Sequence, residues 1–367
     1  MAKEKSASLL RLRIRKFRRL KRGYYSFLFL FGLYVISFFL PFIMGYRPIV
    51  VKYDGHYYFP AAASYVRDTF GIGRSRVYLA SELGQQEVNG QPVFGEAEFR
   101  ALQKQYKKQD EGNWLIMPPI PYGPTEQFLE ADGVPPYPPS RAHWMGTDGS
   151  GRDVLVRLAY GYRVSISFAL LVMIFGYTLG TLVGAFLGFY GGWLDILGLR
   201  FVEIWGSVPF LYTVIILASI FQPSFTLLVS ILAAFGWLGI AYYIRGEFYR
   251  EKNKDYVAAA IAVGESNWTI IRKHILPNAL TPIIAFAPFA IVGMISALVS
   301  LDFLGFGLPV PTPSWGELLR QAKDGGMQAW HIVVFPLGAL FLTLQLIVFI
   351  GEAVREAFDP KVFSRLR

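Results

Sequence analysis

The sequence predicts an all-α, polytopic membrane protein with six transmembrane helices and a long outer insertion. Of its 367 residues, 53% are hydrophobic and only 17% are charged, a composition outside the range of soluble globular domains. Six charge-free runs are long enough, as helices, to cross a hydrocarbon core of about 30 Å. These runs are residues 24–46, 164–194, 204–221, 224–244, 279–301 and 332–351.

The distribution of basic residues predicts the orientation of the chain. Ten of the 36 Lys and Arg residues lie between Lys3 and Arg22, directly before the first apolar run. Because Lys and Arg stay on the cytoplasmic side, we expect residues 1–23 to be a cytoplasmic segment and 24–46 an uncleaved first transmembrane helix. Six spans then also place the tail, residues 352–367, in the cytoplasm. This placement of the net charge of +10 indicates a topology signal and not a nucleic-acid-binding arm.

The outer insertion, residues 47–163, is too long for a simple connection between two spans. Its stretch from Met117 to Pro139 contains eight of the 22 prolines, which favours extended, semi-rigid chain over helix or sheet. Near its end, Asp148 is placed to cap an amphipathic helix that begins at Gly151–Arg152 and lies on the membrane surface.

The second predicted span, 164–194, carries a glycine at every fourth position: Gly176, Gly180, Gly184 and Gly188. Residues with this spacing lie along one stripe of a helix, where a neighbouring backbone can approach closely. That neighbour is either another helix of this subunit or a helix of a partner subunit, and both interpretations stay open here.

The chain shows no residues for catalysis, for a cofactor or for a metal. It contains no cysteine and no G-x-x-x-x-G-K-[ST] loop, and its four histidines are far apart in sequence. The predicted spans also lack internal ionisable residues, which ion-coupled transporters usually need, and only Glu203 and Asp302 lie near helix edges. The driving force for any transport should therefore come from outside the bilayer.

The longest polar interruption of the second half, residues 245–278, is predicted to be a helix–turn–helix at the inner membrane face. The segment Asp255–Ala262 is rich in alanine, and Gly264 can turn the chain. Ser266 can cap a second helix, Asn267–Leu276, which Pro277 would end. Such a loop can insert into a cleft of another protein, or it can lie on the membrane surface without a partner.

At these residues the resemblance to a known family is specific. The stretch DYVAAAIAVGESNWTIIRKHILPN resembles the EAA loop of binding-protein-dependent ABC importer permeases of the oligopeptide/dipeptide family. Two positions depart from the family pattern, since Ala258 stands where an acidic residue is usual and Lys273 replaces an arginine. A salt bridge from that acidic position to an ATPase is therefore in doubt, whereas docking of the loop is not.

Other stretches are similar to the same family, so that the resemblance covers most of residues 141–361. They are HWMGTDGSGRDVLVRLAYGYRVS, RFVEIWGSVP with Glu203 in place of an aspartate, SLDFLGFGLPVPTPSWGELL and the C-terminal GEAVREAFDPK. The outer insertion, with YDGHYYFP and PPIPY, resembles the microcin-C-type peptide importer subgroup.

The resemblance implies an ABC importer permease fold with a core at residues 164–351 and a location in the inner membrane. It implies a second homologous permease that completes the pathway as a heterodimer, a periplasmic binding protein that delivers peptide, and two ATPase subunits. ATP and Mg would bind to those ATPase subunits, so this chain is not expected to be an enzyme.

The resemblance also implies roles for particular residues. Asp302 and Trp315 are candidates for the outer mouth, where Asp302 either attracts the amino end of a peptide or caps a helix. Arg200, Glu203 and Pro209 are candidates for the inner edge. The residues expected to couple the loop to the ATPase are Asp255, Tyr256, Ala259, Ala260, Gly264, Glu265, Ser266, His274 and Pro277.

Three other functions remain as alternatives. The first is an ABC importer permease for another substrate, such as nickel or a sugar. The second is a self-sufficient secondary transporter or channel, which the charge-free spans disfavour. The third is a membrane-anchored enzyme with its active site in residues 47–163, where no paired nucleophile and base is found.

Overall fold

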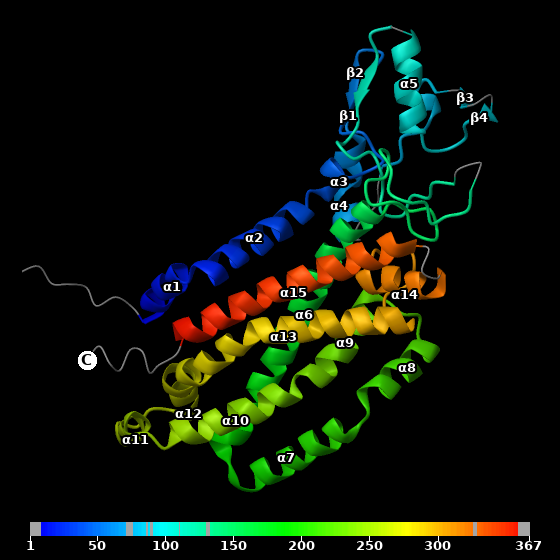
Figure 1. Cartoon of the computed structure of the whole chain (residues 1–367). Coiled ribbons are helices and arrows are strands. Elements are labelled where there is room, and N and C mark those ends of the chain that lie inside the picture. Colours follow the sequence, from blue (N-terminus) through cyan, green and yellow to red (C-terminus); the bar gives the residue numbers. More distant parts are fainter. Residues whose placement is uncertain are drawn as a thin grey trace, which may run out of the picture. The chain divides into compact units, whose positions relative to one another are not determined.

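The computed structural model describes residues 9–70, 76–85, 87–88, 91–109, 111–129, 133–325 and 329–358 (Figure 1). The chain forms two compact units. The helical unit comprises residues 1–31, 164–310 and 337–367, and the insertion unit comprises residues 32–163 and 311–336.

Most of the predicted membrane helices are present as long apolar helices. Among the described residues, four helices are long and apolar enough to span a membrane. They are Val154–Tyr190 (α6), Phe225–Lys252 (α9, Phe225–Gly236, with α10, Leu238–Lys252), Asn267–Leu304 (α12, Asn267–Thr269, with η2, Ile270–Ile275, and α13, Leu276–Leu304) and Trp330–Phe358 (α15). A fifth candidate is the pair α7 (Gly192–Ser207) and α8 (Phe210–Ile220), which is bent by 69°. The break lies at Pro209, whose ring cannot continue a helix without loss of a hydrogen bond.

Two predicted boundaries differ from the structure. The predicted first span, 24–46, is divided into α2 (Lys21–Ser37) and the short α3 (Leu40–Ile43), and Pro41 occupies the first turn of α3. Residues 195–203, which separate the predicted spans 164–194 and 204–221, belong to helix α7. The two charged groups Arg200 and Glu203 are tolerated there because they are exposed and form an ion pair one turn apart.

The core of the helical unit is built from apolar side chains of several helices. One cluster includes Phe168 and Val172 of α6, Leu228 and Leu232 of α9, and Leu298 of α13. A second cluster includes Phe189 of α6, Ile244 and Phe248 of α10, and Ile275 of η2. This second cluster also contains Val257, so the predicted inner loop shares a core with the membrane helices.

The glycine stripe of α6 lies against α9 and α10 of the same chain. A Cβ atom added at Gly180 would lie 2.5 Å from the carbonyl oxygen of Trp237, and one added at Gly184 would lie 2.5 Å from that of Ala241. At Gly188 the nearest atom would be the carbonyl oxygen of Arg245, at 2.7 Å. Real Cβ atoms do not approach other atoms so closely, so glycine is required for this backbone contact.

The insertion unit contains a small sheet that the sequence did not predict. Strands β1 (Val50–Tyr53), β2 (His56–Tyr58) and β5 (Trp114–Ile116) form an antiparallel sheet in the order β2-β1-β5. The β1–β2 hairpin turns at Asp54–Gly55, where both residues have positive φ, as an Asp-Gly turn requires. The described residues of the proline-rich stretch 117–139 form no helix or named strand, in line with their composition.

Helices cover the sheet and complete the insertion unit. The remaining elements are α4 (Pro60–Phe70), the 3₁₀ turn η1 (Ser81–Leu83), β3 (Glu87–Val88), β4 (Gln91–Pro92), α5 (Phe99–Gln109) and α14 (Trp315–Gly325). Val51 of β1 packs with Leu102 and Tyr106 of α5 and with Leu115 of β5 in a buried cluster. The prediction of an all-α protein therefore holds for the membrane helices, whereas the insertion combines helices with a sheet.

We expect Gly184→Ala to destabilise the helical unit by about 1–3 kcal/mol, because the added methyl group must displace the backbone of α10. The melting temperature of the purified protein in detergent, followed by intrinsic fluorescence, measures this effect. Gly239→Ala on α10 is the matched control, since a Cβ there meets no atom within 4 Å. Equal melting temperatures for the two variants would contradict the requirement for close backbone contact.

Candidate functional site

Within the predicted inner loop, residues 245–278, residues 255–276 form a compact helical elbow. After α10, the chain forms α11 (Asp255–Ala262), turns at Gly264 and continues into α12 (Asn267–Thr269). Gly264 has φ of +83°, a left-handed conformation that glycine adopts without steric cost. The Ser266 hydroxyl accepts a hydrogen bond from the Thr269 backbone N–H at 3.3 Å, so Ser266 caps the second helix as predicted.

The prediction that Pro277 ends the second helix is wrong. From α12 the chain passes through a π-helical segment, η2 (Ile270–Ile275), directly into α13 (Leu276–Leu304). Pro277 lies in the first turn of α13, directly after Leu276, whose N–H bonds to the Ile271 carbonyl in the π-helical pattern of η2. The elbow is therefore joined to the long span α13 without an intervening loop.

Polar contacts fix the base of the elbow. The Glu251 carboxylate, which is buried, accepts hydrogen bonds from Lys254 Nζ at 2.7 Å and from the Tyr256 hydroxyl at 2.6 Å. Asn278 Nδ2 donates to the Tyr256 oxygen at 3.3 Å and to the His274 carbonyl at 2.9 Å. Burial, followed by the hydrogen bond to Glu251, raises the pKa of Tyr256, so its hydroxyl remains a donor at neutral pH.

A second contact joins the two helices of the elbow. His274 Nε2 lies 2.8 Å from Glu265 Oε2, which connects η2 to the turn after Gly264. Together with the contacts of Tyr256, it restrains both ends of the elbow against α13. Among the predicted coupling residues, Tyr256, Glu265, Ser266 and His274 therefore hold the shape of the elbow.

The tip of the elbow presents apolar side chains to solvent. Val263 is 84% exposed, Trp268 67% and Ile261 59%. Ala258 and Ala259 are also exposed, whereas Ala260 is buried in the core shared with the membrane helices. Of the two predicted coupling alanines, only Ala259 faces outward, because α11 turns Ala260 toward Ile270 and Ile275.

Asp195 anchors the helix that carries the elbow, and sequence reasoning did not select it. Its carboxylate accepts hydrogen bonds from Arg245 NH2 and from the Tyr249 hydroxyl, both at 2.6 Å, and it is 5% exposed. The sequence did indicate an unusual charge at this position. Asp195 is the first charged residue after the 31-residue apolar run 164–194, which contains most of α6. A charge in that position next to an apolar core requires a partner.

Two predicted outer-mouth residues have structural contacts. Asp302 in α13 is 4% exposed, and its Oδ1 accepts a hydrogen bond from the Leu308 backbone N–H at 2.6 Å, so it holds the loop that follows α13. Trp315 is 1% exposed, and its Nε1 donates to the Leu158 carbonyl at 3.0 Å. Neither side chain presents an exposed surface for a substrate.

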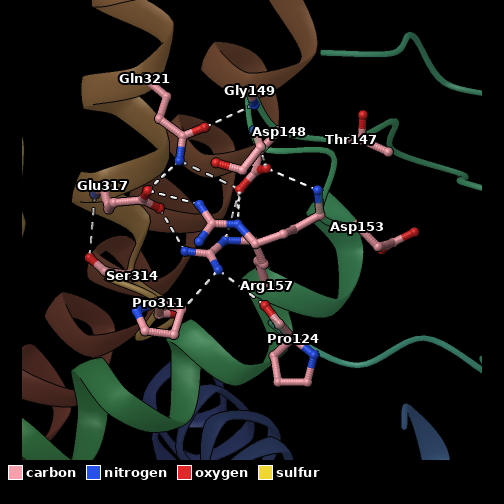
Figure 2. A network of polar contacts seen from close by, with 12 residues as sticks. Pro124, Thr147, Asp148, Gly149, Asp153, Arg157, Pro311, Ser314, Glu317 and Gln321 are labelled. Carbon is pink, nitrogen blue, oxygen red and sulfur yellow. Dashed lines mark hydrogen bonds and ion pairs between the residues drawn. The ribbon is translucent and has the colours of Figure 1, made fainter. Parts of the chain in front are cut away.

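A buried cluster of charges, which we call the outer clamp, lies within the insertion unit (Figure 2). It consists of Asp148, Arg152, Arg157, Glu317 and Gln321. Glu317 Oε1 pairs with Arg152 NH2 at 3.0 Å and Glu317 Oε2 pairs with Arg157 NH2 at 2.6 Å. Asp148 Oδ2 pairs with Arg152 Nε at 2.8 Å and with Arg157 Nε at 3.2 Å.

The clamp corrects the predicted role of Asp148. The helix does not begin at Gly151–Arg152 but at Val154, and Asp153 caps it by accepting from the Val156 N–H at 2.9 Å. Asp148 instead joins a loop and α6 to α14, through Arg152 and Arg157. Arg157 NH1 also donates to the carbonyl oxygens of Pro124 at 3.1 Å and Pro311 at 3.3 Å. Sequence reasoning noticed the motifs that contain these residues but not their pairing.

No group of three or more potential metal ligands is found in the part of the chain that the structure describes. His143 is paired with Asp153, with 2.7 Å between Nδ1 and Oδ2. Both side chains are buried, and Asp153 is also the helix cap. Their contacts are those of a structural hydrogen-bond network.

Comparisons with known proteins give one consistent result. Residues 180–364 match the family model described as "Binding-protein-dependent transport system inner membrane component". The inner membrane ABC transporter permease protein YejE of Escherichia coli K12 is 40% identical over 348 residues, which cover 94% of this chain and 95% of that protein.

Two further relatives differ in their named substrates. The peptidoglycan transport system permease protein YejE of Agrobacterium fabrum is 36% identical, over 95% of this chain and 92% of that protein. The oligopeptide transport system permease protein OppC of Haemophilus influenzae is 41% identical, over 60% of this chain and 70% of that protein.

We expect Glu317→Gln to destabilise the insertion unit by about 3 kcal/mol, because it leaves two buried arginines with one carboxylate. Hydrogen exchange of the α14 amides, followed by mass spectrometry, should become faster by at least tenfold. Asp324→Asn is the matched control, since it removes an exposed carboxylate from the same helix. Unchanged protection of α14 in Glu317→Gln would show that the clamp does not hold this helix.

Proposed function

Because the chain belongs to the family of inner membrane components of binding-protein-dependent transport systems, we propose that it is a permease subunit of an ATP-driven peptide importer. The observation that carries the proposal is the elbow at residues 255–276. It is held rigidly against the membrane helices and exposes Ile261, Val263 and Trp268 at its tip. An exposed apolar tip on a rigid support is suited to a cleft of a partner protein.

In this proposal, two ATPase subunits bind ATP and Mg and move the elbow. Since α12, η2 and α13 form one continuous helix, a displacement of the elbow is transmitted to the membrane span α13 as a rigid body. The helix α10 moves with it, because Tyr256 and Lys254 hold Glu251 of α10. A second, homologous permease would supply the other half of the pathway, and a periplasmic binding protein would deliver the substrate.

The substrate class follows from the named relatives. One is named for oligopeptides and one for peptidoglycan, and cell-wall fragments share peptide bonds with oligopeptides. We propose a peptide-containing solute, and the resemblance of residues 47–163 to microcin-C-type importers supports the same class. ABC importers of nickel or sugars fit these relatives less well.

The decisive experiment is purification of the chain in mild detergent from its native membrane. We expect a second permease and an ATPase pair to co-purify, and a peptide-loaded binding protein to stimulate ATP hydrolysis by the complex in liposomes. Transport by the purified chain alone would instead support a self-sufficient transporter. Enzymatic activity of the intact chain without partners would support the enzyme alternative.

We expect Trp268→Ala to lower the amount of co-purified ATPase by a factor of about ten or more. A tryptophan that becomes buried when two proteins bind contributes strongly to their affinity. Quantitative mass spectrometry of the purified complex measures the ratio of the two proteins. Trp144→Ala is the matched control, since Trp144 in the insertion unit is also 67% exposed. A normal ratio for Trp268→Ala, with the subunit in the membrane, would contradict docking at this tip.

The predicted orientation can be tested directly because the chain contains no cysteine. We expect Val263→Cys to react with a membrane-impermeant maleimide only after the inner membrane is opened, and Phe94→Cys to react in intact spheroplasts. Both positions are strongly exposed, at 84% and 89%. The labelling uses cells that lack the ATPase subunits, so that docking cannot cover Val263 and accessibility reports only the side of the membrane. The reverse labelling pattern would place the elbow outside the cytoplasm and refute the proposed coupling.

A further inference from the structure

A cavity of about 720 Å³ lies beside the elbow within the helical unit. Helices α1 (Leu9–Arg19), α10, α13 and α15 contribute to its wall, together with the first residues of the elbow. The lining residues are Arg13, Tyr243, Arg250, Glu251, Lys254, Tyr256, Asn278, Thr281, Pro282, Ala285, Phe286, Arg355 and Phe358. The cavity is therefore amphipathic, since α13 contributes the apolar residues Pro282, Ala285 and Phe286 and the other elements contribute charged and polar groups.

The charges of the cavity wall are unbalanced. Four cationic side chains line it, against the single carboxylate of Glu251. That carboxylate already accepts hydrogen bonds from Lys254 and Tyr256, and Arg250 pairs with Glu247 at 2.5 Å. Among the described residues, ion pairs therefore balance only the charges of Arg250 and Lys254. Arg13 and Arg355 line the cavity from α1 and α15.

Arg13 has an unused donor inside the structure. Its Nε atom is buried and has no hydrogen-bond partner among the described residues, whereas its NH1 donates to Thr281 Oγ1 at 3.2 Å. The guanidinium group lies over the ring of Phe358, 5.0 Å from its centroid, so its position is fixed. A buried donor without a partner is costly, and an anion in the cavity would remove that cost.

We propose that this cavity binds the phosphate group of an anionic phospholipid, held by Arg13 and Arg355. Arginine pairs well with phosphate oxygens, and basic pockets between membrane helices on the cytoplasmic side are suited to lipid headgroups. The apolar residues Pro282, Ala285 and Phe286 favour a lipid over free phosphate, since they provide a surface for the glycerol and acyl region. Because Tyr256 and Lys254 also line the cavity, the bound headgroup would link α1 to the base of the elbow.

The test uses the complete importer complex, delipidated in detergent and titrated with phosphatidylglycerol under native mass spectrometry. We expect one tightly held lipid, whose affinity falls about fivefold in Arg13→Gln and in Arg355→Gln. Arg18→Gln is the matched control, because it removes an exposed charge from the same helix α1 without altering the cavity. It should bind as the unaltered complex does, and Arg13→Lys should retain part of the affinity.

Three results would overturn the proposal. The first is equal affinity in Arg13→Gln, Arg355→Gln and the unaltered complex. The second is an equal loss in Arg18→Gln, which would indicate diffuse attraction to the basic helix. The third is a change in the ligand itself. Displacement of phosphatidylglycerol by millimolar inorganic phosphate would refute a lipid as the ligand, and equal binding of phosphatidylcholine would refute the requirement for an anionic headgroup. Stimulation of ATP hydrolysis by the binding protein, measured on the same samples, tests the transport function separately.

Discussion

Close contact between the backbones of α6 and α10 is the constraint on which the rest of the helical unit depends. A glycine at every fourth position of α6 removes the side chains that would separate the two helices, and the carbonyl oxygens of Trp237, Ala241 and Arg245 occupy that space. The contact fixes the direction of α10, and the pairing of Arg245 with Asp195 fixes its end. Without such a support, the elbow that follows α10 would have no defined position relative to the membrane helices.

Backbone geometry, apolar packing and polar side-chain contacts together make the elbow rigid. Gly264 provides the left-handed turn, Ser266 caps the next helix, and the buried side chains of Val257 and Ala260 pack with the membrane helices. Polar side chains then connect the elbow to both flanking helices, through Glu251 on α10 and Asn278 on α13. A lever that receives force from a partner needs this kind of double attachment, because a flexible loop would absorb the displacement.

The sequence predicted those features that depend on local pattern. Charge-free runs identified the long helices, and Gly264 and Ser266 indicated the turn and the cap because their effects act on neighbouring residues. Features that depend on pairing between distant residues were missed: the outer clamp joins Asp148 to Glu317 through two arginines, and Asp195 on α7 pairs with Arg245 on α10. The sheet of the insertion was missed because its strands are only three or four residues long and β5 is far from β1 in sequence.

The error at Pro277 shows why local rules failed at the most important junction. Proline usually ends a helix when it removes a hydrogen bond from the interior. Here the π-helical segment Ile270–Ile275 changes the hydrogen-bonding pattern just before the proline, so that Pro277 falls in the first turn of α13. The consequence is mechanical, since a helix that ended at Pro277 would leave a hinge between the elbow and the membrane, whereas the observed continuous helix joins them. The elbow and α13 therefore form one lever, and Asn278 and His274 strengthen it at the junction itself.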